Sequence, residues 1–79
     1  MVKHSKVLIV WHDAHSSSSG WEEVSEIEDE PCVVHTLGWL IPDVKRDHVV
    51  VAQSLIADSE TIDSVLCIPV GMVQSVQVL

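Results

Sequence analysis

Residues 32–55, CVVHTLGWLIPDVKRDHVVVAQSL, decide the fold, because they contain two β-rich runs joined by a short polar segment. The first run, residues 32–41, is rich in Val, Thr and Trp, which favour the pleated surface of a strand. Residues 42–47 interrupt it, since proline cannot donate to a strand ladder and aspartate favours turns, and a valine-rich run follows over residues 48–55. This arrangement predicts an antiparallel hairpin. Gly38, inside the first run, predicts a bulge or sharp bend and therefore a strongly curved sheet.

Three further strands are expected outside the hairpin. Residues 6–12 contain the uninterrupted apolar run VLIVW, which favours a strand covered on both faces, or one that is central in a barrel or an assembly. The run SVLCIPV, residues 64–70, predicts a fourth strand that its proline ends. Alternation in residues 74–79 predicts a fifth strand, after a single tight turn at residues 71–73. The sequence thus predicts one mainly β domain over residues 1–79, a five-stranded, strongly bent antiparallel sheet or small barrel.

One short helix is expected between the first two strands, after a serine-rich polar linker. Trp21, Val24 and Ile27 recur at a spacing of three residues, as side chains on one face of a helix do. Ser18 or Ser19 can cap the N-terminus of this helix, and glutamates in its first turn suit the helix dipole. The helix would hold Trp21 against the sheet.

The segment of this expected helix is strongly acidic, since six of the nine residues from 22 to 30 are Asp or Glu and none is basic. A run of like charges is commonly a solvated surface. The functional alternatives are a docking surface for a basic partner and a low-affinity cation site.

The three tryptophans differ in their expected roles. Trp39 alternates with Leu37 and Ile41 and is expected in the core. Trp11 ends its strand, where it either reaches the surface or caps the core, and exposed tryptophans are enriched at the centres of interfaces. The candidate partner-binding residues are therefore the tryptophans and acids that the expected outward face would share: Trp11, Trp21, Glu22, Glu23, Glu26, Glu28 and Asp29.

Size and composition favour association. A chain of 79 residues buries only about 60% of its unfolded surface, yet 47% of these residues are hydrophobic, so we expect a homo-oligomer or a docking partner. A net charge of −8, with only four Lys and Arg, disfavours nucleic acid and acidic membranes as partners. No apolar run approaches the roughly 20 residues of a membrane span, and the N-terminal apolar patch is too short for a signal peptide. The cytoplasm is the expected location.

His12, Asp13 and His15 form the sharpest local signal for chemistry, because imidazole and carboxylate groups are suitable zinc ligands. The alternative is a polar strand end followed by a loop. Cys32 and Cys67 lie in apolar runs, where a thiol is inert, and we expect both to behave as small hydrophobic residues. The chain contains no GxSxG, no phosphate-cradling glycine loop and no supported carboxylate pair. We expect a protein that is not an enzyme and has no cofactor.

Four motifs are spread over nearly the whole chain: Val10-Trp11-x-Asp13-Ala14, Gly20-Trp21, Thr36-x-Gly38-Trp39-Leu40 and Ile68-Pro69-x-Gly71-Met72-Val73. Together they resemble a group of short, uncharacterised proteins of tailed bacteriophages. The order of expected strands is also similar to small β-barrels of the Sm-like and SH3-like type. In those barrels a bent second and third strand lead to a fourth, then to an Ile-Pro turn and a short closing strand.

These resemblances imply a phage-encoded, non-enzymatic module in the cytoplasm of the host cell that self-assembles, as Sm-like rings do, or binds a host or phage protein. Two alternatives stay open. One is an oligomer that holds a small molecule or metal between subunits. The other is an Sm-like ring associated with RNA, although this chain lacks the glycine-rich second signature and the basic surface of RNA-binding Sm proteins.

Overall fold

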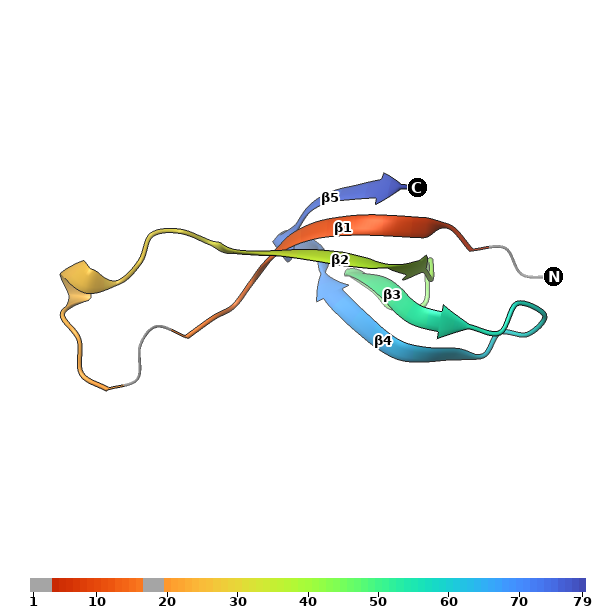
Figure 1. Ribbon diagram of the computed structural model, residues 1–79, viewed down its shortest axis with the longest axis horizontal. Helices are drawn as coiled ribbons and strands as arrows, with labels where there is room; N and C mark the ends of the chain where they lie inside the picture. Colours follow the sequence, from red (N-terminus) through yellow and green to blue (C-terminus); the bar gives the residue numbers. More distant parts are fainter. Residues whose placement is uncertain (1–3, 17–19) are drawn as a thin grey trace.

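Five antiparallel strands form one open sheet in the computed structural model, which describes residues 4–16 and 20–79 (Figure 1). The strand order is β4-β3-β2-β1-β5, so β5 returns to the far side of β1. The predicted five-stranded antiparallel sheet is confirmed, and of the two predicted forms the open sheet is observed. The strands are β1 (Lys6–Asp13), β2 (Cys32–Leu40), β3 (His48–Leu55), β4 (Ile62–Pro69) and β5 (Val73–Val78).

Short connections link β2 to β3, β3 to β4 and β4 to β5, at the interruptions that the sequence predicted between these strands. The β2–β3 loop covers residues 41–47, in which Asp43 and Asp47 adopt positive φ angles of 59° and 57°. Strand β4 ends at Pro69, and the 3₁₀ turn η2 (Val70–Met72) leads into β5. The Val70 N–H donates to the Asp47 carbonyl oxygen at 3.0 Å, so the β2–β3 loop and η2 are held side by side.

Strands β2 and β3 approach each other closely at Gly38. Strand β1 pairs with β2 along its whole length, whereas β2 pairs with β3 only at Trp39 and Leu40 in the part of the chain that the structure describes. At Gly38 a Cβ atom would lie 2.8 Å from the Ala52 carbonyl oxygen, which is closer than a side chain tolerates. Beyond this point the Gln53 side-chain amide donates to the Leu37 carbonyl oxygen at 2.9 Å in place of a ladder bond. The sheet therefore separates into a β5-β1-β2 half and a β3-β4 half.

The main core lies between these two halves. Val7, Ile9 and Trp11 of β1 contact Val51 of β3 and Ile68 of β4, and all five side chains are buried. The opposite face of β1 is half-buried, and β1 lies between β2 and β5 in the sheet. A smaller cluster of Ile41, Val50 and Ala52 lies separately.

The exposed face of β2 is the one that carries Trp39. Side chains from Val33 to Leu37 alternate between exposed and half-buried, and Leu37 is 58% exposed. Trp39 itself is half-buried, with the Lys6 Nζ 5.9 Å from its ring centroid, a cation–π contact. The prediction that Trp39 joins the core is therefore wrong, because strand alternation places the inward side chains of β2 at the even positions.

The predicted helix between β1 and β2 is reduced to one 3₁₀ turn, η1 (Val24–Glu26). The reason is electrostatic, since Glu22, Glu26 and Glu30 are like charges four residues apart, which destabilise a helix. A short helix also has a costly nucleus, and the candidate caps Ser18 and Ser19 lie outside the described residues. Because η1 and η2 are the only helical turns described, no helix in that part of the chain has the length and apolar character needed to cross a membrane.

Candidate protein-binding surfaces

The acidic arm, residues 21–30, extends away from the sheet beyond the end of the β1–β2 hairpin (Figure 1). The last pair of that hairpin, Asp13 and Cys32, marks where the two strands part. Every residue of the arm is exposed, and the molecule is 55 Å long but only 22 Å wide. The arm is therefore reachable by another protein without any rearrangement of the sheet.

Apolar side chains of the arm face solvent. Trp21 is fully exposed, Val24 is 83% exposed and Ile27 is 56% exposed. The η1 turn is held by the Glu26 N–H, which donates to the Glu23 carbonyl oxygen at 3.0 Å, and by the Ile27 N–H, which donates to the Val24 carbonyl oxygen at 3.2 Å. The turn thus gives these apolar side chains a local backbone of defined shape.

Acidic side chains surround this apolar group. A hollow of about 290 Å³ beside Trp21 is lined by Glu22, Glu23 and Glu26. An exposed aromatic side chain ringed by charge is the usual composition of an interface anchor, where the aromatic group supplies affinity and the charges select the partner. The arm is suited to a surface that offers apolar contact and a basic rim.

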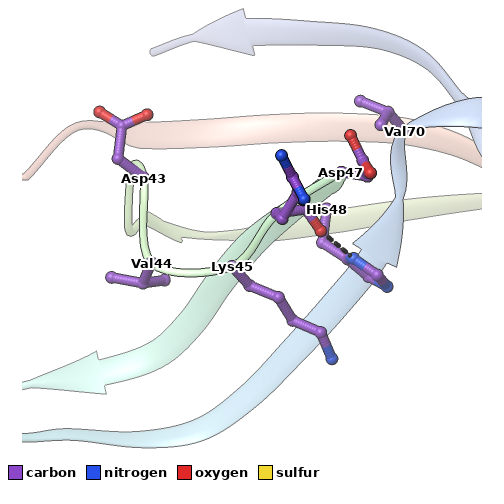
Figure 2. A pocket seen from close by; sticks show the side chains of 7 residues that line it. Asp43, Val44, Lys45, Asp47, His48 and Val70 are labelled. Atoms are coloured by element: carbon purple, nitrogen blue, oxygen red, sulfur yellow. Dashed lines mark hydrogen bonds between the residues drawn. The ribbon is translucent and has the colours of Figure 1, made fainter.

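A second surface lies at the opposite end of β2, around the β2–β3 loop (Figure 2). Residues 43–48 and Val70 line an open hollow of about 550 Å³. Val44 and Val70 contribute apolar side chains to it and are 62% and 51% exposed. The His48 Nδ1–H donates to the Arg46 carbonyl oxygen at 2.7 Å, which leaves Nε2 as the second polar atom of the ring.

The same hollow holds two of the four basic residues of the chain, Lys45 and Arg46, beside the acidic Asp43 and Asp47. No ion pair joins either base to a carboxylate within residues 4–16 and 20–79. Both bases are exposed. The hollow can therefore contact an acidic, partly apolar segment of a partner.

A third surface is the outward face of β1 and β2. Leu8 and Val10 of β1 lie there beside Leu37, His35 and Val33 of β2. Val33 is 52% exposed, and the side chains of β1 are half-buried by their neighbours in the sheet. This face is largely apolar, and Lys6, Leu37 and Trp39 line a hollow of about 300 Å³ at one end of it. It carries little charge to select a partner.

The structure separates the sequence-predicted binding residues. Trp21, Glu22, Glu23, Glu26, Glu28 and Asp29 all lie on the exposed arm. Trp11 does not join them, because it is only 8% exposed and its indole N–H donates to the Thr36 hydroxyl at 2.9 Å. Of the two roles considered for Trp11, capping of the core is the one observed. The expectation that Trp21 packs on the sheet is wrong, since Trp21 is fully exposed.

The metal candidates do not converge. His12 and Asp13 are consecutive residues of β1 and so point to opposite faces of the sheet, while His15 follows the strand in an exposed segment. Among the described residues, no three His, Cys, Asp or Glu side chains group closely enough to hold an ion. Cys32 and Cys67 are free thiols, both half-buried.

The loop hollow was missed by sequence reasoning. Its signal was present, because Lys45 and Arg46 are the only adjacent basic residues in the chain. This pair of bases is easily overlooked, because the chain has a net charge of −8 and only four Lys and Arg residues. What sequence alone does not reveal is that η2 brings Val70 beside the loop and so adds an apolar wall to the two bases.

No protein-family model, curated protein or solved structure matches this chain.

Proposed function

We propose that this chain is a non-enzymatic assembly module that binds another protein subunit through its acidic arm. The observation that carries the proposal is the full exposure of Trp21 beside the exposed Val24 and Ile27. A large apolar side chain gains about 1.5–3 kcal/mol when it leaves water, and the arm leaves three such side chains unburied. Burial of these side chains against a partner would recover that free energy.

Charge gives the proposed contact its direction. The six acids among residues 22–30 make the arm repel acidic surfaces and attract basic ones. Such charges mainly speed association and exclude wrong partners, while the buried aromatic group supplies affinity. The proposed partner surface therefore has an apolar seat for Trp21 and a basic rim.

Following the resemblance to phage proteins, we propose that this module acts in the cytoplasm of an infected host cell. It would act there as a homo-oligomer or bound to a host or phage protein. The strand order β4-β3-β2-β1-β5 and the Ile68-Pro69 turn before a short β5 support the kinship with small Sm-like and SH3-like β-barrels. The acidic composition disfavours an Sm-like ring that binds RNA, because contacts to phosphate groups require a basic surface. Protein rather than nucleic acid is the proposed partner.

Site-specific photo-crosslinking tests the proposal. A benzophenone amino acid replaces Trp21 in one variant and Ile56 in a second, and each protein is irradiated alone and in bacterial extract. Ile56 is the control because it is 61% exposed in the β3–β4 loop and lies far from the arm in sequence. We expect crosslinked protein from position 21 and only background from position 56, with peptide mapping to identify the surface contacted.

Equal, unspecific labelling from both positions would contradict the proposal. A crosslink from position 21 that disappears when Glu26, Glu28 and Asp29 are changed to Lys would show that the acids select the partner. The matched charge control changes Asp58, Glu60 and Asp63 to Lys. Both triple variants have the same net charge, since −8 + 6 = −2.

A further inference from the structure

We infer that the partner of the acidic arm is a second copy of this chain, whose β2–β3 loop hollow receives Trp21. This inference rests on the proposed function and names the surface that the arm binds. The arm extends away from the sheet beyond the β1–β2 hairpin, whereas the hollow lies between the β2–β3 loop and η2, so a chain does not fill its own hollow (Figure 1). The contact must join two molecules.

The hollow offers bases to the acidic arm. The arm carries acids and no bases, whereas the hollow carries Lys45 and Arg46, half of the basic residues of the chain. Neither base has a carboxylate partner among the residues described. Asp43 and Asp47 also line the hollow and equal its bases in number, so the attraction depends on direct contact between these two bases and the acids of the arm.

The two surfaces also match in apolar character and size. Trp21, Val24 and Ile27 of the arm would contact Val44 and Val70, the exposed apolar side chains of the hollow. The volume of about 550 Å³ lies within the range of about 300–1,000 Å³ in which pockets accept organic groups larger than an indole ring. The Nε2 atom of His48 offers an acceptor for the indole N–H of Trp21.

Such a contact is head-to-tail, because each copy offers one arm and one hollow. A head-to-tail contact repeats from copy to copy until it closes into a ring or grows as an open filament. It would cover the apolar side chains of both surfaces at every junction. A small chain with 47% hydrophobic residues cannot easily bury all of its apolar surface by itself, and this contact would bury part of the remainder.

The test uses two charge reversals of the full chain, with association followed by sedimentation velocity. The arm variant carries Glu26→Lys, Glu28→Lys and Asp29→Lys, and the loop variant carries Lys45→Glu and Arg46→Glu. The arm variant then has three acids and three lysines, so its arm no longer attracts bases, while the loop variant has four acids in its hollow that repel its acidic arm. We expect the wild type to associate and each variant alone to associate at least about tenfold more weakly.

Mixing the two variants supplies the decisive result. In an equimolar mixture the acidic arm of the loop variant meets the unchanged hollow of the arm variant, so the wild-type contact is available once in each pair. We expect the mixture to recover association as pairs that contain one copy of each variant. The control with Lys at positions 58, 60 and 63 has the same charge as the arm variant and should associate as the wild type does.

Three results would overturn the inference. These are a wild type that stays monomeric at every concentration, association that neither reversal weakens, and a mixture that fails to recover. If position 21 crosslinks a different protein while the wild type stays monomeric, the arm still binds a partner and only the self-docking is lost. If position 21 crosslinks nothing, the proposed function fails with it.

Discussion

Trp11 and Trp21 lie ten residues apart in the sequence and in opposite environments. Trp11 is 8% exposed, packs in the main core and donates its indole N–H to Thr36 across the β1–β2 ladder. Trp21 is fully exposed on the acidic arm. The same residue type therefore packs in the core at one position and is exposed to solvent at the other.

The difference between the two comes from what pairs with the backbone around them. Strand β1 is paired on both sides, by β2 and β5, so its inward side chains are aligned over the opposite half of the sheet. The arm contains no strand, and two backbone hydrogen bonds hold its η1 turn. Repulsion among its acids opposes compaction. Trp11 is buried because β2 and β5 hold the backbone of its strand over the other half of the sheet. Apolar character alone does not bury a tryptophan in this fold, since Trp21 is exposed.

The largest expected effect is the loss of stability caused by Trp11→Ala. Removal of a buried tryptophan side chain from a core costs about 3–5 kcal/mol, and a domain of this length has roughly 4–12 kcal/mol in total. We expect the free energy of unfolding, measured by urea denaturation, to fall by about 3–5 kcal/mol, a large fraction of the total. Trp11→Phe provides a graded control, since it keeps much of the volume but loses the bond to Thr36, at a cost of about 1–2 kcal/mol. If Trp11→Ala unfolded at the same urea concentration as the wild type, Trp11 would not be part of the stabilising core.

A smaller loss is expected from Gly38→Ala, which tests whether the close approach of β2 and β3 at this position is required for the core that contains Trp11. The new Cβ would meet the Ala52 carbonyl oxygen at 2.8 Å and the Val51 Cγ2 at 2.9 Å. Because the first of these atoms is backbone, β2 and β3 must move apart, and overpacking of this kind costs about 1–3 kcal/mol. The matched control is Gly71→Ala, where nothing lies within 4 Å of the added Cβ and no loss is expected. Equal stability of the two variants in thermal unfolding would contradict a close approach at Gly38.

Much of the fold was predictable because its signals are local. The runs around Ile9, Val50 and Val65 contain residues that favour strands, and Pro42 and Pro69 interrupt or end them. Antiparallel pairing followed from the short connections between runs. The face of β2 that turns inward was not predictable, because both of its faces are mostly apolar, and that is why Trp39 was assigned to the core.

The candidate site was predictable in its residues but not in its shape. Composition alone marked the acids and Trp21 as an outward surface. A spacing of three between apolar residues suggested a helix lying on the sheet, yet this spacing does not report whether anything lies beneath it. The hollow around Lys45 and Arg46 depends on η2 lying beside the β2–β3 loop, a contact between segments more than twenty residues apart.

The smallest expected effect on stability is that of Trp21→Ala, and it completes the comparison with Trp11. A fully exposed side chain loses no packing when it is shortened, so the free energy of unfolding should change by no more than about 0.5 kcal/mol. Urea denaturation of the monomer, at a protein concentration below that of association, measures this change without the contribution of a partner. Ile56→Ala, in the exposed β3–β4 loop, should behave in the same way. A loss comparable to that of Trp11→Ala would mean that the arm packs on its own sheet in solution, and Trp21 would then belong to the fold instead of to an interface.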